Sequence, residues 1–226
     1  MSQTILGTGL LLGLAFGAWG SPACTNQTLD NYIALGAGGC EMNGLLFNNF
    51  AYSYTMGVDS FYVSGVTGTG TVQDASVVNV GVVNANTAFN FGAQWTVNHY
   101  QTASLNLSYN VSAPTTQILS LQNAFTTTQN GIQNGGPSSS MAAVCTGGSC
   151  APTAFTNGIV AIAPTHGPLL ITHTFDMNAN GSSLATINRV HLLTVSDQFT
   201  TTPEPASYGM LGLGMAGLAF ARRRRR

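Results

Sequence analysis

Apolar and polar residues alternate strictly in two segments of this 226-residue chain. In residues 89–97 every odd position is apolar, Phe89 and Trp95 among them, and residues 105–111 repeat the pattern. An extended strand directs successive side chains to opposite faces, so this period of two predicts β-strands with one buried face. The other face is unusual, because its positions hold Asn, Gln, Ser, Thr and Gly without a charge.

Further strands are predicted where β-branched and aromatic residues gather between Gly-, Pro- and Asn-rich turns. These segments are residues 50–56, 60–64, 77–83, 118–125, 158–163, 169–175 and 185–195. A short helix is predicted near residues 28–35, and residues 130–151 are predicted to form a surface loop. Many short strands without amphipathic helices between them predict an all-β body, an antiparallel β-sandwich of jelly-roll or immunoglobulin-like form, over residues 24–200.

Charged residues make up only 6% of the chain, against about 25% in an average soluble domain. Lysine is absent, and Arg189 is the only arginine before the terminal run of Arg222, Arg223, Arg224, Arg225 and Arg226. A nucleic-acid-binding protein neutralises phosphates with many dispersed cations. Nucleic-acid binding is therefore excluded.

Residues 1–23 have the pattern of a signal peptide. An apolar run over residues 5–19 precedes small residues at which signal peptidase could cut. Cleavage after Gly20 and cleavage after Ala23 both fit, and the second is preferred. No Lys or Arg precedes the apolar run, which departs from the usual pattern. The alternatives are a buried N-terminal helix and a lipoprotein attached through Cys24.

The carboxyl end combines three elements. Pro203, Glu204 and Pro205 precede a mostly apolar stretch over residues 206–221, and the five arginines follow it. As a helix this stretch would extend roughly 24 Å, which is short of the ~30 Å hydrocarbon core of a bilayer, but snorkelling arginines can close the gap. Basic clusters stay on the cytoplasmic side, so the sequence predicts a single transmembrane helix with the body outside.

This three-part end, residues 201–226, resembles the PEP-CTERM sorting signal of Gram-negative bacteria. The resemblance implies recognition by exosortase, a transpeptidase-like cysteine protease of the membrane that cuts near the Pro-Glu-Pro element. It also implies an intermediate in the inner membrane and transfer to the cell surface or an exopolysaccharide matrix. A tail anchor that is never processed is the alternative.

A looser resemblance spans residues 28–112. The segments 29–34, 46–52 and 103–109 are similar in pattern to those of a recurrent family of exported PEP-CTERM proteins whose bodies are uncharacterised. This resemblance implies a β-rich body and no activity. The family's usual Gly-Asp step is Asn43-Gly44 here, so no role for an aspartate carries over.

Four cysteines in an exported chain predict two disulfides with three possible pairings. Proximity in the sequence favours Cys24 with Cys40 and Cys145 with Cys150. A zinc site is the alternative, but the first pair lacks the close spacing of zinc ligands. The sequence therefore predicts no metal and no cofactor.

His166, His173 and Asp176 lie close together in the sequence, and their side chains are suitable metal ligands. On a strand over residues 169–175, however, Asp176 points away from His173, and His166 lies in a loop. We expect separate surface or edge residues rather than a site.

Enzyme chemistry has little support. A glycosidase needs two carboxylates in a cleft, and only the pairs Asp59 with Asp74 or Asp176 with Asp197 could supply them through folding. The chain has no nucleophile elbow, phosphate loop or metalloprotease helix. We therefore expect that the protein is not an enzyme.

Aromatic side chains suggest a binding function. Six aromatic residues could stack on sugars: Trp95, Tyr52, Tyr54, Tyr62, Tyr100 and Tyr109. Trp95, however, lies on an apolar face, which is more typical of a core residue. The leading prediction is an exported protein of the cell surface or exopolysaccharide matrix, processed by signal peptidase and exosortase, with a structural or interaction role. A lectin-like carbohydrate-binding module is the alternative, and a secreted hydrolase is a third possibility.

Overall fold

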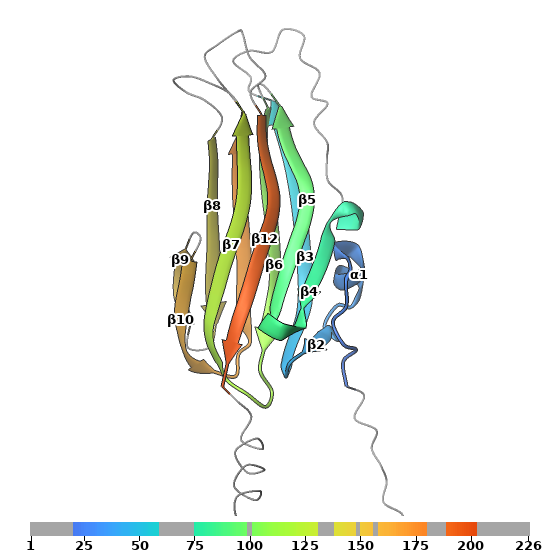
Figure 1. The fold of residues 1–226 in the computed structure, drawn as a ribbon, viewed down its shortest axis with the longest axis vertical. Coiled ribbons are helices and arrows are strands. Elements are labelled where there is room, and N and C mark those ends of the chain that lie inside the picture. The colour runs from blue at the N-terminus through green and yellow to red at the C-terminus, as the bar shows by residue number, and fades with distance from the viewer. Residues whose placement is uncertain are drawn as a thin grey trace, which may run out of the picture.

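The computed structural model describes residues 20–58, 75–98, 101–130, 138–147, 150–155, 158–179 and 189–202. Two antiparallel six-stranded sheets lie one in front of the other, with their strands along the long axis of the molecule (Figure 1). Sheet 1 has the order β1 (Gln27–Thr28), β4 (Asn79–Val83), β5 (Ala88–Asn98), β12 (Arg189–Thr201), β7 (Ile118–Asn130), β10 (Gly158–Thr165). Sheet 2 has the order β2 (Cys40–Met42), β3 (Leu45–Val58), β6 (Gln101–Ser112), β11 (Leu169–Asn178), β8 (Ser138–Gly147), β9 (Cys150–Phe155).

Strands β5 to β12 pair as a long ribbon folded back on itself. β5 pairs with β12, β6 with β11, β7 with β10 and β8 with β9, and all four pairs are antiparallel. The pairs alternate between the two sheets, so the ribbon wraps around the core. β4 and β3 then extend the two sheets beside β5 and β6.

The predicted helix is confirmed as α1 (Leu29–Ala34). Leu29 and Tyr32 are three residues apart, so they share one face of the helix, and both are fully buried. The Tyr32 ring contacts Phe50 and Phe89 at centroid distances of 5.0 and 5.6 Å. The helix therefore closes one edge of the core. Two short 3-10 helices, η1 (Ala75–Val77) and η2 (Asn84–Asn86), flank β4.

The core lies between the sheets and is built by the predicted alternation. On β6 the side chains of Ala103, Leu105, Leu107, Tyr109 and Val111 are buried, and the residues that alternate with them face outward. Phe47 packs edge-on against Phe89 and Phe199 of the opposite sheet, with ring centroids 4.7 and 5.5 Å apart. The two-layer antiparallel β architecture predicted from the sequence is therefore confirmed.

One predicted element is wrong. Residues 130–151 were expected to form a surface loop, but β7 continues to Asn130, β8 occupies Ser138–Gly147, and β9 begins at Cys150. The segment is rich in Ser, Gly and Ala, which have little strand preference. It forms a strand because β8 pairs with β11 on one side and with β9 on the other. The predicted strand over residues 60–64 lies outside the described residues.

Candidate functional site

A cluster of four polar side chains lies in the centre of the sandwich. Asp197 belongs to β12 and Asn123 to the neighbouring β7 of sheet 1, where the two residues are paired across the strands. Tyr109 of β6 and His173 of β11 reach them from sheet 2. The exposed fractions are 1% for Asn123 and 0% for the other three residues. The cluster therefore has no contact with solvent.

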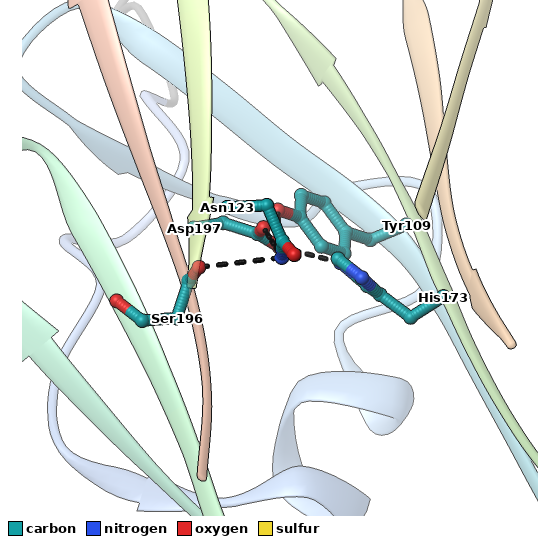
Figure 2. Close-up of polar contacts among 5 residues, drawn as sticks. All are labelled: Tyr109, Asn123, His173, Ser196 and Asp197. Atoms are coloured by element: carbon teal, nitrogen blue, oxygen red, sulfur yellow. Dashed lines mark hydrogen bonds and ion pairs between the residues drawn. The ribbon is translucent and has the colours of Figure 1, made fainter. Parts of the chain in front are cut away.

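The Asp197 carboxylate is the centre of this cluster (Figure 2). Its Oδ2 accepts a hydrogen bond from the Tyr109 hydroxyl at 2.6 Å and lies 2.7 Å from His173 Nε2. Its Oδ1 accepts from Asn123 Nδ2 at 2.9 Å. A carboxylate only accepts, so Nε2 of His173 is the protonated nitrogen in this contact. The bonds from Tyr109 and His173 join sheet 2 to sheet 1, and the bond from Asn123 lies within sheet 1.

Burial and charge act in opposite directions on Asp197. Burial alone would raise the pKa of its carboxyl, but attraction to His173 and the hydrogen bonds from His173, Tyr109 and Asn123 outweigh it, and the pKa is lowered. The pKa of Tyr109 is raised well above its ordinary value by burial, by the negative charge of Asp197 and by their hydrogen bond. The structure therefore favours an ionised Asp197 and a neutral Tyr109.

Two buried atoms of the cluster lack hydrogen-bond partners among the described residues, namely His173 Nδ1 and Asn123 Oδ1. A catalytic group must reach its substrate, and none of these four side chains reaches the surface. The arrangement acts as a polar link inside the core. An intact buried network of this kind adds little net stability, whereas removal of one partner is strongly destabilising.

The expectation that His173 is a surface or edge residue is wrong. Its side chain shares a face with Ile171 and Phe175, as the alternation predicts, but that face is the core, and His173 is fully buried. Asp176 is on the opposite, exposed face, and the exposed His166 bonds through Nδ1 to the carbonyl of Ala113 at 2.9 Å. The three residues therefore form no joint site. Across the described part of the chain, His, Cys, Asp and Glu form no group of three that could hold a metal ion.

The structure also does not bring together the described pair of acids that was considered for a glycosidase site. Asp176 and Asp197 lie on opposite faces, one exposed and one buried, so they share no cleft. Asp59 and Asp74 lie outside the described residues. Sequence analysis named Asp197 only as a possible partner of Asp176 and did not place it in the core, where it is the one buried carboxylate among the described residues. The signal in the sequence was an acid between the apolar Val195 and Phe199.

The four candidate sugar-stacking aromatic residues that the structure describes, Trp95, Tyr52, Tyr54 and Tyr109, belong to the core or pack against it. Trp95 and Tyr109 are buried in the core, and Trp95 Nε1 donates to the Tyr52 hydroxyl at 2.8 Å. Tyr62 and Tyr100 lie outside the described residues. The expectation that Trp95 is a core residue is confirmed.

Among the cysteines, Cys24 and Cys40 form a disulfide with a sequence separation of 16. The backbones of Cys145 and Cys150 lie on β8 and β9, but their side chains are outside the description, so their pairing stays a prediction. The disulfide joins the amino-terminal segment to β2 at the edge of sheet 2.

The amino-terminal residues join the body before Cys24. Ser21 Oγ donates to the carbonyl of Gly38 at 2.7 Å. The carbonyl of Pro22 accepts from the amide of Glu41 at 2.8 Å, and Ala23 forms a parallel bridge with Glu41. Residues 21–23 are therefore part of the folded body.

The folded body continues to the start of the carboxyl-terminal signal. The amide of Thr202 donates to the carbonyl of Gln117 at 2.9 Å, and the amide of Gln117 donates to Thr202 Oγ1 at 3.1 Å. The next residue is Pro203. Residues 203–226, with Pro203, Glu204, Pro205 and the arginine run, lie outside the described residues, as does the predicted transmembrane helix. Of the helices that the structure does describe, none has the length and apolar character needed to cross a bilayer.

A two-layer β body followed by a short terminal signal is thus the class that sequence and structure define together. Residues 201–226 match the PEP-CTERM protein-sorting motif. The motif indicates an exported bacterial protein that exosortase sorts to the cell surface or the extracellular space. No curated protein and no solved structure matches the chain.

Proposed function

We propose that this chain is a non-enzymatic component of the cell surface or the exopolysaccharide matrix of a Gram-negative bacterium, delivered there as a rigid β-sandwich. The observation that carries the proposal is the match of residues 201–226, at the carboxyl-terminal end of the body in the sequence, to the sorting motif. The last described residue, Thr202, is still bonded to Gln117, so no long linker separates the body from Pro203. Exosortase therefore acts at the boundary of the body and leaves a compact product.

The proposal is tested by replacing Pro203, Glu204 and Pro205 with Ala in the native host. The expected result is that the variant keeps its tail, stays with the membrane fraction and does not reach the surface or medium. Pro114→Ala, a substitution in a loop of the body, is the matched control and should be processed normally. An unchanged mass and location of the triple variant would contradict the proposal.

We also propose cleavage by signal peptidase after Gly20, with Ser21 as the first residue of the exported form. Cleavage after Ala23 would remove the bonds that Ser21 and Pro22 make with Gly38 and Glu41. It would also place a charged amino group on Cys24, whose amide donates to the carbonyl of Glu41 at 2.9 Å and whose side chain is buried. N-terminal sequencing of the exported protein separates the two sites, and a chain that begins at Cys24 would contradict this assignment.

The order of the strands supports the jelly-roll form over the immunoglobulin-like form. A jelly roll is an eight-stranded double sheet, built from two Greek keys. The four ribbon pairs from β5–β12 to β8–β9, two in each sheet, correspond to that arrangement. An immunoglobulin-like sandwich has no equivalent of this continuous folded ribbon.

The absence of enzyme activity is part of the proposal. Its support is that the central polar cluster is closed to solvent and that Asp176 and Asp197 face opposite sides of the sandwich. Incubation of the purified protein with the host exopolysaccharide, followed by chromatography of the soluble products, tests this point. Release of oligosaccharides that is lost in Asp176→Asn would identify a hydrolase instead.

A further inference from the structure

We propose that the outer face of sheet 2 binds a neutral carbohydrate chain at a shallow pocket, called here the distal pocket. The pocket has a volume of about 410 Å³ and is formed by consecutive residues of three adjacent strands, β3, β6 and β11. Six outward-facing positions line it: Thr55, Gly57, Thr102, Ser104, Asp176 and Asn178.

The strand register places these six residues in two rows across the sheet. Thr55 pairs with Ser104, which pairs with Asp176 on its other side. Two positions further along, Gly57, Thr102 and Asn178 form the second row. Neighbouring strands are about 4.8 Å apart. The pocket therefore offers a regular grid of short polar groups, all held on rigid strands.

The chemistry of the grid fits sugar hydroxyls. Threonine and serine hydroxyls both donate and accept, the asparagine amide does both, and the carboxylate accepts. The Thr55 hydroxyl already donates to the carbonyl of Ser104 at 3.3 Å, so it serves the ligand as an acceptor. Asp176 is exposed and lies in the lining of the pocket. The lining contains no cation, and the chain has no lysine and a single arginine outside its terminal run. An anionic ligand would be repelled by Asp176, so the complementary ligand is neutral and rich in hydroxyls.

Gly57 keeps the pocket open. A Cβ at this position would lie 2.7 Å from Thr102 Oγ1, so any side chain here would crowd the neighbouring Thr102 within the second row of the pocket. The contact is with the end of a side chain rather than with the backbone, and the φ angle of Gly57 is not in the left-handed region. A larger residue at position 57 can therefore fill the pocket without breaking the strand.

The alternatives to a sugar lack support in the lining. Protein interfaces depend on buried aromatic and apolar anchors. The large hydrophobic side chains that are exposed among the described residues, Val77, Ile159 and Leu170, do not line the pocket. Calcium prefers several carboxylate or carbonyl oxygens, and Asp176 is the single acid among the lining residues.

The pocket lies at the end of the body opposite Thr202, the last described residue before Pro203. β12 runs over 13 residues to Thr201 and pairs Arg189 with Asn98 at its other end, where β6 begins at Gln101 (Figure 1). A strand of this length spans about 43 Å. A chain held by its tail would thus present the pocket away from the membrane. This placement rests on the proposed function, whereas the chemistry of the pocket does not.

The test is affinity electrophoresis of the full-length chain, kept soluble in a polyoxyethylene detergent that carries no sugar. Native gels contain hydroxyethylcellulose, galactomannan or dextran as neutral polymers and polygalacturonate as the anionic one. Slower migration is expected with at least one neutral polymer and none with polygalacturonate. Gly57→Val should abolish the retardation, and Asp176→Asn should weaken the apparent affinity about tenfold or more.

Thr172→Val is the matched control for Thr102→Val, because Thr172 lies on the same face of β11, four residues from Asp176 and outside the pocket. Thr102→Val should weaken binding and Thr172→Val should not. Circular dichroism of each variant shows whether the fold is kept. The proposal is overturned if no neutral polymer retards the protein, if polygalacturonate alone does so, or if folded Gly57→Val binds normally. Binding by a chain that the host neither exports nor processes would uphold the pocket and reject the proposed function.

Discussion

His173 Nε2 and Asp197 Oδ2 lie 2.7 Å apart and join β11 of sheet 2 to β12 of sheet 1 in the centre of the core. Each residue is fully buried, so neither can turn to water if the other is removed. A buried charge that loses its partner keeps its desolvation penalty without the compensating attraction. The removal of one partner should therefore lower the stability by more than the intact pair contributes to it.

The first prediction concerns the loss of one partner. His173→Ala should lower the free energy of unfolding by about 3–5 kcal/mol, because it leaves the Asp197 carboxylate without its cross-sheet partner. The measurement is urea unfolding at neutral pH. Asp176→Asn is the control, since Asp176 is an exposed acid on the same strand, and it should change stability by less than about 0.5 kcal/mol. Equal small effects of both variants would contradict the assigned role of the pair.

The second prediction concerns acid. The pKa of Asp197 is lower in the folded chain than its ordinary value of 3.8, so the unfolded chain binds this proton more readily. The stability that the group contributes is complete above the ordinary pKa and is lost as the pH falls through it towards the folded value. At pH values below about 5 the free energy of unfolding of the native protein should therefore decrease as the pH is lowered. In Asp197→Asn this decrease, the acid limb of the stability curve, should be less steep. Parallel acid limbs would be inconsistent with the lowered pKa.

The sequence was sufficient for the architecture but not for the central cluster, and β12 shows why. Val190 and Leu192 are buried, but after the shift in register between Leu192 and Thr194 the buried positions become Val195, Asp197 and Phe199. A strict period of two from Val190 would place Asp197 outside. An irregularity of one residue changes the face of every later side chain, and no local residue pattern marks its position.

The strand pairing that forms β8 and β9 could not be predicted from the sequence either. Their residues have weak strand preferences, and the strand state depends on β11, a segment distant in the sequence. By contrast, β6 has a strong alternation with no irregularity, and its buried face is the one predicted. Local patterns therefore identified strands with their own preference, and tertiary pairing determined the others.

The third prediction compares two tyrosines. The Tyr54 hydroxyl is buried without a hydrogen-bond partner among the described residues, whereas the Tyr109 hydroxyl donates to Asp197. Tyr54→Phe should be neutral or slightly stabilising, and Tyr109→Phe should lower the free energy of unfolding by about 1.5–3 kcal/mol, the range for a bond to a charged group. Urea unfolding at pH 7 measures both. A larger loss in Tyr54→Phe than in Tyr109→Phe would refute the comparison.

Alkaline unfolding provides the fourth prediction. Burial raises the pKa of Tyr54 to about 12, so the folded chain keeps its phenol proton after the unfolded chain, with an ordinary value of 10.0, has begun to lose it. A raised pKa gives stability that is complete below the ordinary value and is lost as the pH rises above it. The native protein should therefore lose stability above about pH 10, and the loss should be smaller in Tyr54→Phe. Identical slopes in the alkaline range would exclude a contribution from Tyr54.

The fifth prediction uses two glycines of the turn before β2. Gly36 and Gly39 have φ angles of +54° and +59°, so an L residue is strained at either position. Around Gly36 a Cβ would meet nothing within 4 Å, but at Gly39 it would collide with the carbonyl oxygen of Phe47 and lie 2.6 Å from the Cβ of Asn48. Gly36→Ala should cost about 1–2 kcal/mol. Gly39→Ala should cost clearly more, because relief requires the backbone of β2 and β3 to separate beside Cys40. Thermal unfolding of the two variants gives the comparison, and equal shifts in Tm would mean that the close packing of this turn against β3 contributes nothing.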